Sequence, residues 1–349
     1  MRQISYVQAL NEALHQLIAG DENVFLIGQG VNSPWYAGNS TVGLVERFGE
    51  GRVIDTPISE NCVAGTAIGA ALTGMRPILF HARMDFMYLA MDQLANNAAS
   101  WHYMYGGNLN VPLTIWGVIN RGGEQGAQHS QAIHAMLAHI PGLKVVMPAT
   151  PYDAKGLLIS SVADSNPVVY VDERWLYAHQ GDVPEEMYTV PIGKGAVRRE
   201  GKDVTVVATS YMVIEALKAA EILEKESIDV EVIDLRTLKP LDESLVIGSV
   251  KKTRRLVVAD SGWKSFGAGA EVITRVMEHD DFRFSRAVPV ARVSLPDIPA
   301  PASRALEKQY YPDAISIATA VRKVIGDNYS SSKLEMLLPW HMGFPVEEG

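Results

Sequence analysis

Short apolar runs that alternate with helical patterns are the feature that most limits how this chain can fold. In the first half, the runs at 24–27, 77–80 and 113–117 are largely apolar and are separated by segments with helical periodicity. A strand without polar alternation is covered on both faces, and a helical crossover returns the next strand in the same direction. The pattern therefore predicts an α/β fold in which helices cover parallel sheets.

A polar region from 177 to 197, punctuated by proline and glycine, separates this half from a second alternating series. The length of 349 residues is sufficient for two hydrophobic cores. Beyond residue 326 the chain opens polar and becomes apolar around Trp340, which fits either a docking segment or a disordered end. We therefore divide the chain into a first α/β domain (1–185), a linker (186–203), a second α/β domain (204–326) and a C-terminal tail (327–349).

The segment 53–60 places an acidic residue at a strand-to-helix corner. It reads as a β-branched strand, a proline-containing turn and a helix start, and small residues fill the following helix at 61–72. Gly65 and Gly69 lie one turn apart in that helix, so they indicate a close approach by a backbone or a ligand. Glu60 is then either a helix N-terminal charge or a carboxyl group with a tuned pKa.

Several polar or irregular segments follow predicted strands. Gln29, Glu60, the segment after Phe80 and the loop after Gly117 all stand at the carboxyl end of such a strand. Ligands of parallel sheets bind at these ends, so the convergence favours a functional role for Glu60.

The loop 121–130 is rich in glycine and contains a histidine. It lacks the lysine and hydroxyl pair of a phosphate-binding loop and the dinucleotide spacing, so its glycines either cradle another ligand or allow motion. His129 precedes a helix predicted from Ser130, where the helix dipole disfavours imidazolium. It is either a neutral acid/base or a capping or exposed side chain. For the single Cys62 we expect a small buried residue rather than a nucleophile, because no histidine or cation is evident beside it.

Composition excludes several classes of function. A net charge of −9, with no run of lysine and arginine, argues against nucleic acid as a partner. No apolar run approaches about 18 residues, so no membrane span is predicted. One cysteine and no charged-then-apolar leader indicate a reducing, cytoplasmic location.

Segments spread over both halves carry a resemblance to one family. They read RVIDTPISE at 52–60, MDQ at 91–93, QHSQ at 128–131, PGLKVV at 141–146, SGW at 261–263, FGAGAE at 266–271 and PD at 296–297. Together they resemble the β subunit of the E1 component of thiamine-diphosphate-dependent 2-oxo acid dehydrogenases. This transketolase-like group includes pyruvate, branched-chain and acetoin dehydrogenases. The resemblance implies a pyrimidine-binding (PYR) domain followed by a transketolase C-terminal-like domain.

The resemblance assigns roles to residues of the first domain. Glu60 is implied to hydrogen-bond N1′ of the cofactor's aminopyrimidine and to shuttle its proton. His129 is implied to face the substrate and the acyl acceptor, so these two are the expected catalytic residues. Phe86 falls where the family stacks an aromatic ring on the pyrimidine, and Ile58 and Gln29 complete the expected cofactor contacts.

The resemblance also bears on metals and on a partner chain. In many family members backbone oxygens hold a potassium ion, and the matching residues are Leu113, Ser161, Val162, Asp164 and Asn166. The Gly-Asp-Gly motif that binds Mg²⁺ and the diphosphate is missing from this sequence. We therefore expect an α subunit to supply those ligands, in an α₂β₂ heterotetramer with the active site between subunits.

Three departures from the family pattern concern the substrate. Gly28-Gln29 replaces the usual Gly-Glu, and Trp116 stands where pyruvate-type members often have arginine. The third departure is the run HARMD at 81–85, which replaces an aromatic-rich run beside the cofactor. Within it, Arg83 either pairs with an anionic group of the substrate or is an ordinary surface arginine. Arg83, Trp116 and Gln128 are the expected substrate contacts.

These expectations define one leading function and two rivals. The leading one is a β subunit that, with its α subunit, decarboxylates a 2-oxo acid on thiamine diphosphate and passes the acyl group to a lipoyl-bearing E2 component. The first rival is a split transketolase-like or specialised-metabolism enzyme that transfers a two-carbon ketol or acyl unit to a sugar or an acyl carrier protein. The second is a catalytically silent scaffold, which the retention of Glu60, Phe86 and His129 argues against.

Overall fold

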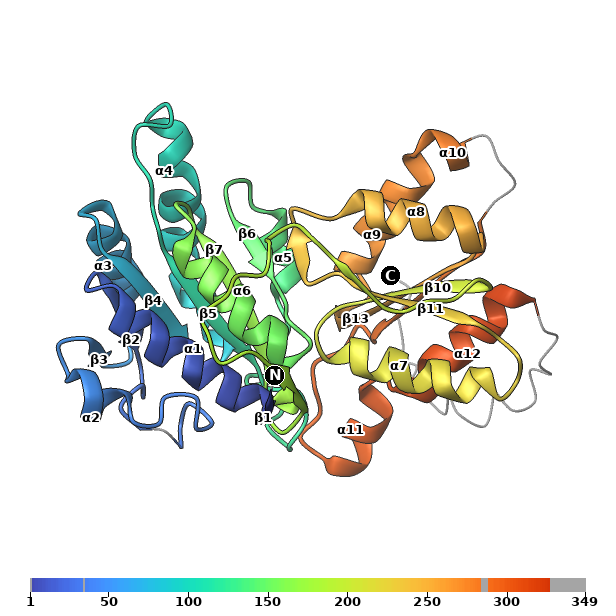
Figure 1. The fold of residues 1–349 in the computed structure, drawn as a ribbon, viewed down its shortest axis with the longest axis horizontal. Helices are drawn as coiled ribbons and strands as arrows, with labels where there is room; N and C mark the ends of the chain where they lie inside the picture. Colours follow the sequence, from blue (N-terminus) through green and yellow to red (C-terminus); the bar gives the residue numbers. More distant parts are fainter. Residues whose placement is uncertain (1, 34, 284–287, 327–349) are drawn as a thin grey trace, which may run out of the picture.

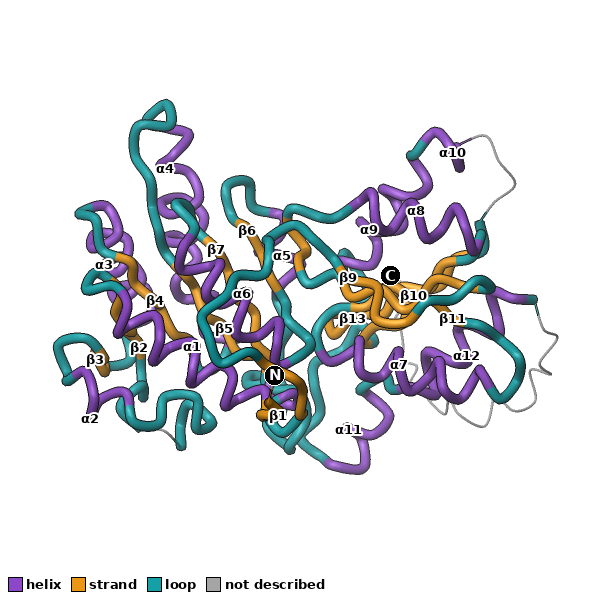
Figure 2. The backbone as a smooth tube through the Cα atoms, viewed as in Figure 1, coloured by secondary structure: helices purple, strands orange, loops and turns teal. Residues whose placement is uncertain are grey.

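Two α/β units lie side by side in the computed structural model, which describes residues 2–33, 35–283 and 288–326 (Figure 1). The unit drawn in blue to green comes from the first half of the chain, and the unit in yellow to red comes from the second. Each is built on a mostly parallel sheet with helices on its faces, which confirms the predicted fold class (Figure 2). The predicted tail, with Trp340, lies outside the described residues.

The first sheet has seven strands in the order β12-β6-β7-β5-β4-β2-β3. Neighbouring strands are parallel except for β12, which comes from the second half of the chain and runs antiparallel to β6. The middle strands β5 and β7 are buried at every position, which explains their lack of polar alternation. The strands are β2 (Val24–Gly28), β3 (Val53–Asp55), β4 (Arg76–His81), β5 (Thr114–Ile119), β6 (Lys144–Val146), β7 (Val168–Glu173) and β12 (Thr237–Lys239).

Helices on the two faces of this sheet bury two separate apolar clusters. Helices α1 and α6 pack on one face, and α3, α5 and the η1–η2–α4 segment pack on the other. The helices are α1 (Tyr6–Gly20), α2 (Leu44–Phe48), α3 (Glu60–Leu72), the 3₁₀ helix η1 (Met84–Ala90), the π helix η2 (Asp92–Ala98), α4 (Ala99–Met104), α5 (His134–His139), α6 (Pro151–Ala163) and the 3₁₀ helix η3 (Arg174–Leu176). A two-stranded sheet, β1 (Arg2–Ser5) with β8 (Gln180–Val183), joins the ends of this unit.

The chain after β4 does not form one regular helix but three successive segments, η1, η2 and α4. The side-chain amide of Asn97 donates to the carbonyl of Asp92 (3.4 Å), and the hydroxyl of Ser100 donates to the carbonyl of Ala95 (3.1 Å). Both bonds span five residues, so they compete with the regular helical ladder and favour the wider π turn.

The second sheet has five strands in the order β14-β13-β10-β11-β9. Strand β9 is antiparallel to β11 and lies inside the segment predicted as a linker, where its polar edge sequence gives no apolar periodicity. The strands are β9 (Ala196–Arg199), β10 (Val204–Ala208), β11 (Val230–Asp234), β13 (Leu256–Trp263) and β14 (Val290–Leu295). The helices are α7 (Tyr211–Glu224), α8 (Glu243–Thr253), α9 (Ala268–Glu278), α10 (Asp280–Arg283), α11 (Arg304–Tyr310) and α12 (Ala314–Ile325).

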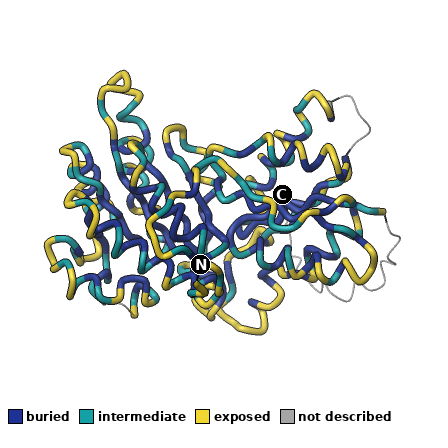
Figure 3. Tube along the Cα trace, viewed as in Figure 1, coloured by how far each residue is buried: buried dark blue, intermediate teal, exposed yellow. Residues whose placement is uncertain are grey.

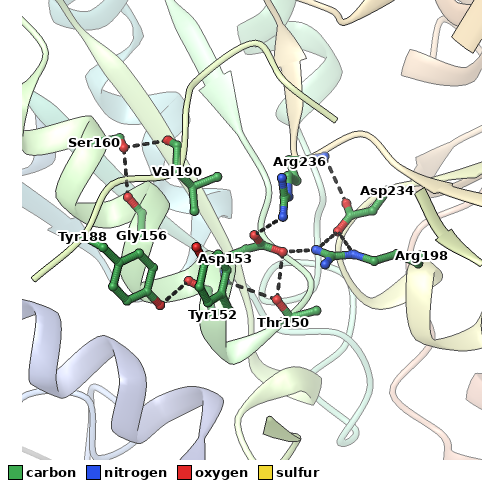
Figure 4. A network of polar contacts seen from close by, with 10 residues as sticks. All are labelled: Thr150, Tyr152, Asp153, Gly156, Ser160, Tyr188, Val190, Arg198, Asp234 and Arg236. Atoms are coloured by element: carbon green, nitrogen blue, oxygen red, sulfur yellow. Dashed lines mark hydrogen bonds and ion pairs between the residues drawn. The ribbon is translucent and has the colours of Figure 1, made fainter. Parts of the chain in front are cut away.

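A buried ion-pair network joins the two units (Figure 4). Arg198 on β9 pairs with Asp234 at 2.7 Å and also with Asp153 on α6, and Arg236 pairs with Asp153 at 2.8 Å. Both carboxylates are 0% exposed. Two guanidinium groups therefore balance two buried carboxylates where α6 of the first unit meets the second sheet.

Burial follows the sheets of both units. Figure 3 shows the strands largely buried, while exposed positions gather on loops and on the outer ends of helices such as α4 and α10. Within the described ranges, no helix is long and apolar enough to cross a membrane.

Candidate active site

Glu60 is the first residue of α3, directly beyond the turn that follows β3. Ser59 precedes it as the N-cap, but the Ser59 side chain makes no capping hydrogen bond. The Glu60 side chain is partly buried, and it has no hydrogen-bond or ion-pair partner in the described part of the chain. A carboxylate in this position is available to a ligand.

A cavity opens beside this carboxylate at the carboxyl ends of β2, β3 and β4. Ile58, Val63 and Leu79 contribute apolar surface to it. Burial lowers the pKa of His81 to about 4, so this imidazole is neutral near pH 7. The cavity is lined by Gly28, Gln29, Tyr36, Thr56, Pro57, Ile58, Ser59, Glu60, Val63, Leu79, Phe80, His81, Ala82, Arg83 and Phe86.

Two glycines allow the wall of this cavity to form. A Cβ atom at Gly28 would lie 2.4 Å from the carbonyl oxygen of Phe80, so only glycine fits between β2 and β4 there. Gly30 has φ +72°, and a Cβ atom on it would lie 2.2 Å from the ring of Tyr36. These close approaches bring Gln29 and Tyr36 to the same cavity.

Phe86 and His129 come together from distant segments. Their rings meet edge to face, with centroids 5.3 Å apart. The carboxylate of Asp85, beside Phe86 on η1, accepts a hydrogen bond from the amide of Gln131 at 3.0 Å. This bond ties η1, which lines the Glu60 cavity, to the loop that carries His129.

The helix predicted from Ser130 begins only at His134, as α5. Residues 131–133 are irregular in the structure, and the backbone amide of Gln131 donates to the carboxylate of Asp85. His129 is therefore not at a helix N-terminus, and the predicted effect of the helix dipole on its charge does not apply.

One expectation for α3 differs from the structure, and the close approach expected at Gly69 is not made by the described chain. Cys62 is exposed rather than buried, because α3 turns Ala64, Ala67 and Ile68 toward the core and leaves Cys62 on its outer face. A Cβ atom at Gly69 would meet nothing within 4 Å, so no close approach within the described chain requires glycine there.

Trp116 and Gln128 do not line the Glu60 cavity. Trp116 is 0% exposed, and its indole Nε1 donates to Asp172 at 3.2 Å, since β5 is covered on both faces. Gln128 is exposed on the glycine-rich loop. Of the three expected substrate contacts, only Arg83 reaches the cavity.

Two of the five residues expected to hold potassium, Val162 and Asp164, already have cationic partners. The guanidinium of Arg76 donates to the carbonyls of Val162 (2.7 Å) and Asp164 (3.1 Å), and the ammonium of Lys144 contacts the carboxylate of Asp164 at 2.5 Å. The carbonyl of Leu113 accepts a hydrogen bond from the backbone amide of Val168. The hydroxyl of Ser161 donates to the carbonyl of Leu157, and the backbone amide of Asn166 donates to the carboxylate of Asp164. Two positive charges at this position do not fit a bound cation.

A second, larger cleft of about 480 Å³ adjoins the Glu60 cavity and shares Tyr36 and Arg83 with it. It is lined by Trp35, Tyr36, Arg83, Asn120, Arg121, Gly122, Gly123, Gln125, Arg174 and Trp175. No cluster of three or more histidine, cysteine, aspartate or glutamate side chains suited to a metal ion occurs among the residues that the structure describes.

Tyr36, Arg174 and Trp175 were not among the residues predicted for the site. Arg174 and Trp175 follow β7 directly, so their place at the carboxyl end of a strand was a usable signal. Tyr36 had no such signal, because its place depends on the loop geometry around Gly30.

Comparisons with known proteins agree with this architecture. Residues 2–180 match the family "Transketolase, pyrimidine binding domain", and residues 193–317 match "Transketolase, C-terminal domain". The chain is 42% identical over 322 residues to "Pyruvate dehydrogenase E1 component subunit beta" of Rickettsia felis, covering 92% of this chain and 98% of that protein. It is 41% identical to the mitochondrial protein of that name from Bos taurus, covering 93% and 91%.

The chain is also similar to two proteins whose names describe other enzymes. The chain is 40% identical to "Acetoin:2,6-dichlorophenolindophenol oxidoreductase subunit beta" of Cupriavidus necator, covering 93% of this chain and 98% of that protein. A solved structure titled "Split gene transketolase, inactive beta4 tetramer" superposes with a TM-score of 0.75 at 25% identity, covering 92% and 98%.

The two domains and the cavity between β3 and η1 define a thiamine-diphosphate-dependent, transketolase-like protein. Within that class, the chain belongs to the family of E1 β subunits of 2-oxo acid dehydrogenases. The cavity suits an aminopyrimidine: it offers a free carboxylate, an aromatic ring at Phe86 and apolar walls.

Proposed function

We propose that this chain is the β subunit of a heteromeric thiamine-diphosphate-dependent 2-oxo acid dehydrogenase, active only with an α subunit. The observation that carries the proposal is the unpaired carboxylate of Glu60 in a cavity that also holds Phe86, inside the segment matched to the pyrimidine-binding domain. The named relatives, β subunits over nearly their full length, support it.

Each residue of the cavity has a defined task in this proposal. Thiamine diphosphate, when bound, supplies the acceptor for the electron pair released when a 2-oxo acid loses CO₂. Glu60 holds and returns the proton at N1′ of the aminopyrimidine, and Phe86 offers its ring to the pyrimidine. Ile58 and Gln29 line the same cavity and complete the contacts to the cofactor. The ring of His129 contacts Phe86, and in this proposal His129 acts on the substrate and the acyl acceptor.

The partners and metals follow from the same proposal. The α subunit supplies the Mg²⁺ and diphosphate ligands, in an α₂β₂ assembly that would work in the cytoplasm. The acyl acceptor is a lipoyl group on an E2 component or another carrier protein. Potassium is not part of the proposal, because Arg76 and Lys144 occupy the matching position.

A split transketolase-like activity is the second candidate. The structural similarity to a split-gene transketolase favours it, since that reaction uses the same cofactor with a ketose donor. The two candidates differ in donor and acceptor and leave the role of Glu60 unchanged.

The test is co-expression with an α-type partner followed by turnover assays with pyruvate, branched-chain 2-oxo acids and ketose phosphates. An artificial electron acceptor reports decarboxylation. We expect turnover of a 2-oxo acid, with at least a 100-fold loss in Glu60→Gln and Glu60→Ala, in line with the about 10²–10⁴-fold contribution of acid–base groups.

The matched control is Glu46→Gln, an exposed glutamate in the first turn of α2. It should keep full activity. Consumption of ketose phosphates alone would favour the transketolase-like candidate. Full activity of both Glu60 variants would refute a catalytic role for this chain.

A further inference from the structure

The cleft beside the Glu60 cavity carries positive charge without a matching acidic lining. Three arginines, Arg83, Arg121 and Arg174, line it, and no aspartate, glutamate or lysine does. The chain as a whole has a net charge of −9, so this concentration of one sign runs against the average surface. A cleft lined by one sign of charge attracts ligands of the opposite sign.

Two of the three arginines have donors to spare. Arg174 donates from Nη2 to the carbonyl of Tyr36 at 2.6 Å, and Arg83 donates to the carbonyl of Ala82 at 2.8 Å and weakly to Gln125 at 3.5 Å. A guanidinium carries five N–H donors, so most of these remain for a ligand. Neither side chain forms an ion pair with any carboxylate in the described ranges.

Arg121 has a structural task instead. It is 4% exposed, donates to the carbonyl of Pro312, and lies about 5 Å from the ring centres of Trp175, Tyr211 and Tyr311. It therefore packs the wall of the cleft against the second domain, and its buried guanidinium adds positive charge to the cleft.

Arg83 and Arg174 also repel each other. Burial lowers the pKa of Arg83, and the charge of Arg174 lowers it further. The carboxylate of Asp172 is 0% exposed and already accepts bonds from Trp116 and Tyr177, so it does not enter the cleft. An anion between the two guanidinium groups would relieve this repulsion and form charge-assisted hydrogen bonds.

The chemistry of decarboxylation indicates which anionic group of the substrate the cleft binds. The reacting carboxylate of a 2-oxo acid leaves as neutral CO₂: its bond to the carbonyl carbon breaks, and the electron pair stays on that carbon. Tight pairing of that carboxylate with arginine would stabilise the ground state more than the transition state and slow the reaction. A charge retained throughout the reaction is bound equally in both states, so it lowers KM without lowering kcat.

Resting on the proposed function, we propose that Arg83 and Arg174 bind a second anionic group of the donor substrate, a carboxylate or phosphate at the end remote from the reacting carbonyl. Arg83 and Tyr36 line both cavities, so one molecule can span them. Trp35, 80% exposed, and Trp175 give the cleft apolar walls for the carbon chain between the two groups.

Binding to the full-length chain alone is the first arm of the test. Trp35 and Trp175 report ligand entry through tryptophan fluorescence, with inorganic phosphate and butyrate as anionic probes and butyramide as the neutral control. We expect saturable signals with an anion only, and an affinity at least 10-fold weaker in the double variant Arg83→Gln/Arg174→Gln. Arg47→Gln, an exposed arginine on α2, should match the unmodified chain. Arg83→Lys, which keeps the charge, should retain part of the affinity if the double variant unfolds.

Turnover by the complex with the α subunit is the second arm. 2-Oxopentanoate and 2-oxoglutarate have equally long chains and differ in the terminal carboxylate, and a ketose and its phosphate test the phosphate source. We expect the donor with an anionic end to have a KM at least 10-fold lower than the uncharged donor. The double arginine variant should raise the KM of the anionic donor at least 10-fold and should raise the KM of the uncharged donor much less.

Equal KM values for charged and uncharged donors, or equal losses for both in the double variant, would overturn the inference. Absence of arginine-dependent anion binding to the chain alone would also overturn it. Failure of the proposed function looks different: no donor turns over, while arginine-dependent anion binding persists and still supports the cleft as an anion site.

Discussion

The ring of Phe86 meets the imidazole of His129 edge-on, with the centroids 5.3 Å apart. The contact joins η1, which lines the Glu60 cavity, to the glycine-rich loop 121–130. That loop lines the second cleft, called the arginine cleft below because Arg83, Arg121 and Arg174 line it. The hydrogen bond from the Gln131 amide to Asp85 holds the same two segments together. The placement of His129 therefore depends on a carboxylate that does not itself line the cavity.

We expect Asp85→Ala to reduce turnover of the reconstituted enzyme by about 5- to 10-fold, the effect of one lost hydrogen bond of about 1 kcal/mol. His129 would lose its support, while the cavity residues remain in place. Asp85→Asn keeps an acceptor oxygen and should stay close to the unmodified enzyme. An equal loss in both variants would mean that the charge of Asp85, and not its hydrogen bond, matters.

The position of Arg76 predicts that stability does not depend on potassium. The thermal midpoint of the unmodified chain should be the same in potassium and sodium chloride at equal ionic strength. In Arg76→Met, the carbonyls of Val162 and Asp164 lose their donor, at a cost of about 1–3 kcal/mol, and potassium should restore part of it. A potassium-specific rise of the midpoint in the unmodified chain would contradict this interpretation.

Arg198 should be far more important for stability than its neighbour Arg199. Arg198→Met leaves the buried carboxylates of Asp153 and Asp234 short of a partner, which should cost about 3–5 kcal/mol. Arg199 pairs with Glu224 at the surface, so Arg199→Met should cost less than about 1 kcal/mol. Thermal midpoints of the two variants, measured side by side, check this; similar losses would show that the buried network contributes little.

The sequence predicts those parts of the fold that a local apolar pattern specifies. The strands β2, β4 and β5 and the helix α3 lie within a residue or two of the runs predicted at 24–27, 77–80 and 113–117 and the helix predicted at 61–72. Strands β9 and β12 escape prediction because they are short and polar and are defined by pairing with distant strands.

The site likewise has one part that local sequence predicts and one part that it does not. The Glu60 corner follows from a local strand, turn and helix start. The arginine cleft does not, because Arg83 and Arg174 lie on separate strand ends that only the order of strands β4, β5 and β7 brings together. Trp116 was expected near the substrate, but burial of β5 on both faces turns it into a core residue.

The buried pair His134–Asp260 gives the chain a specific dependence of stability on pH. The imidazole Nε2 lies 2.9 Å from Asp260 Oδ1, with exposed fractions of 0% and 1%. Burial alone would lower the pKa of His134, but the carboxylates of Asp260 and Glu173 outweigh it and raise the pKa. For Asp260, burial opposes ionisation, but His134 and the hydroxyl of Thr209 outweigh it and lower the pKa.

The sign follows from these directions. The contribution of His134 is complete below its unfolded pKa of about 6.5 and is lost as the pH rises through its higher folded value. That of Asp260 is present above its unfolded pKa of about 3.9 and is lost as the pH falls through its lower folded value. His134→Gln should therefore lower the thermal midpoint most near pH 6, and its deficit should shrink toward pH 9. His139→Gln, on the same helix but outside this pair, is the control. A deficit that does not change between pH 6 and 9 would mean that His134 is neutral in the folded chain and acts by packing alone.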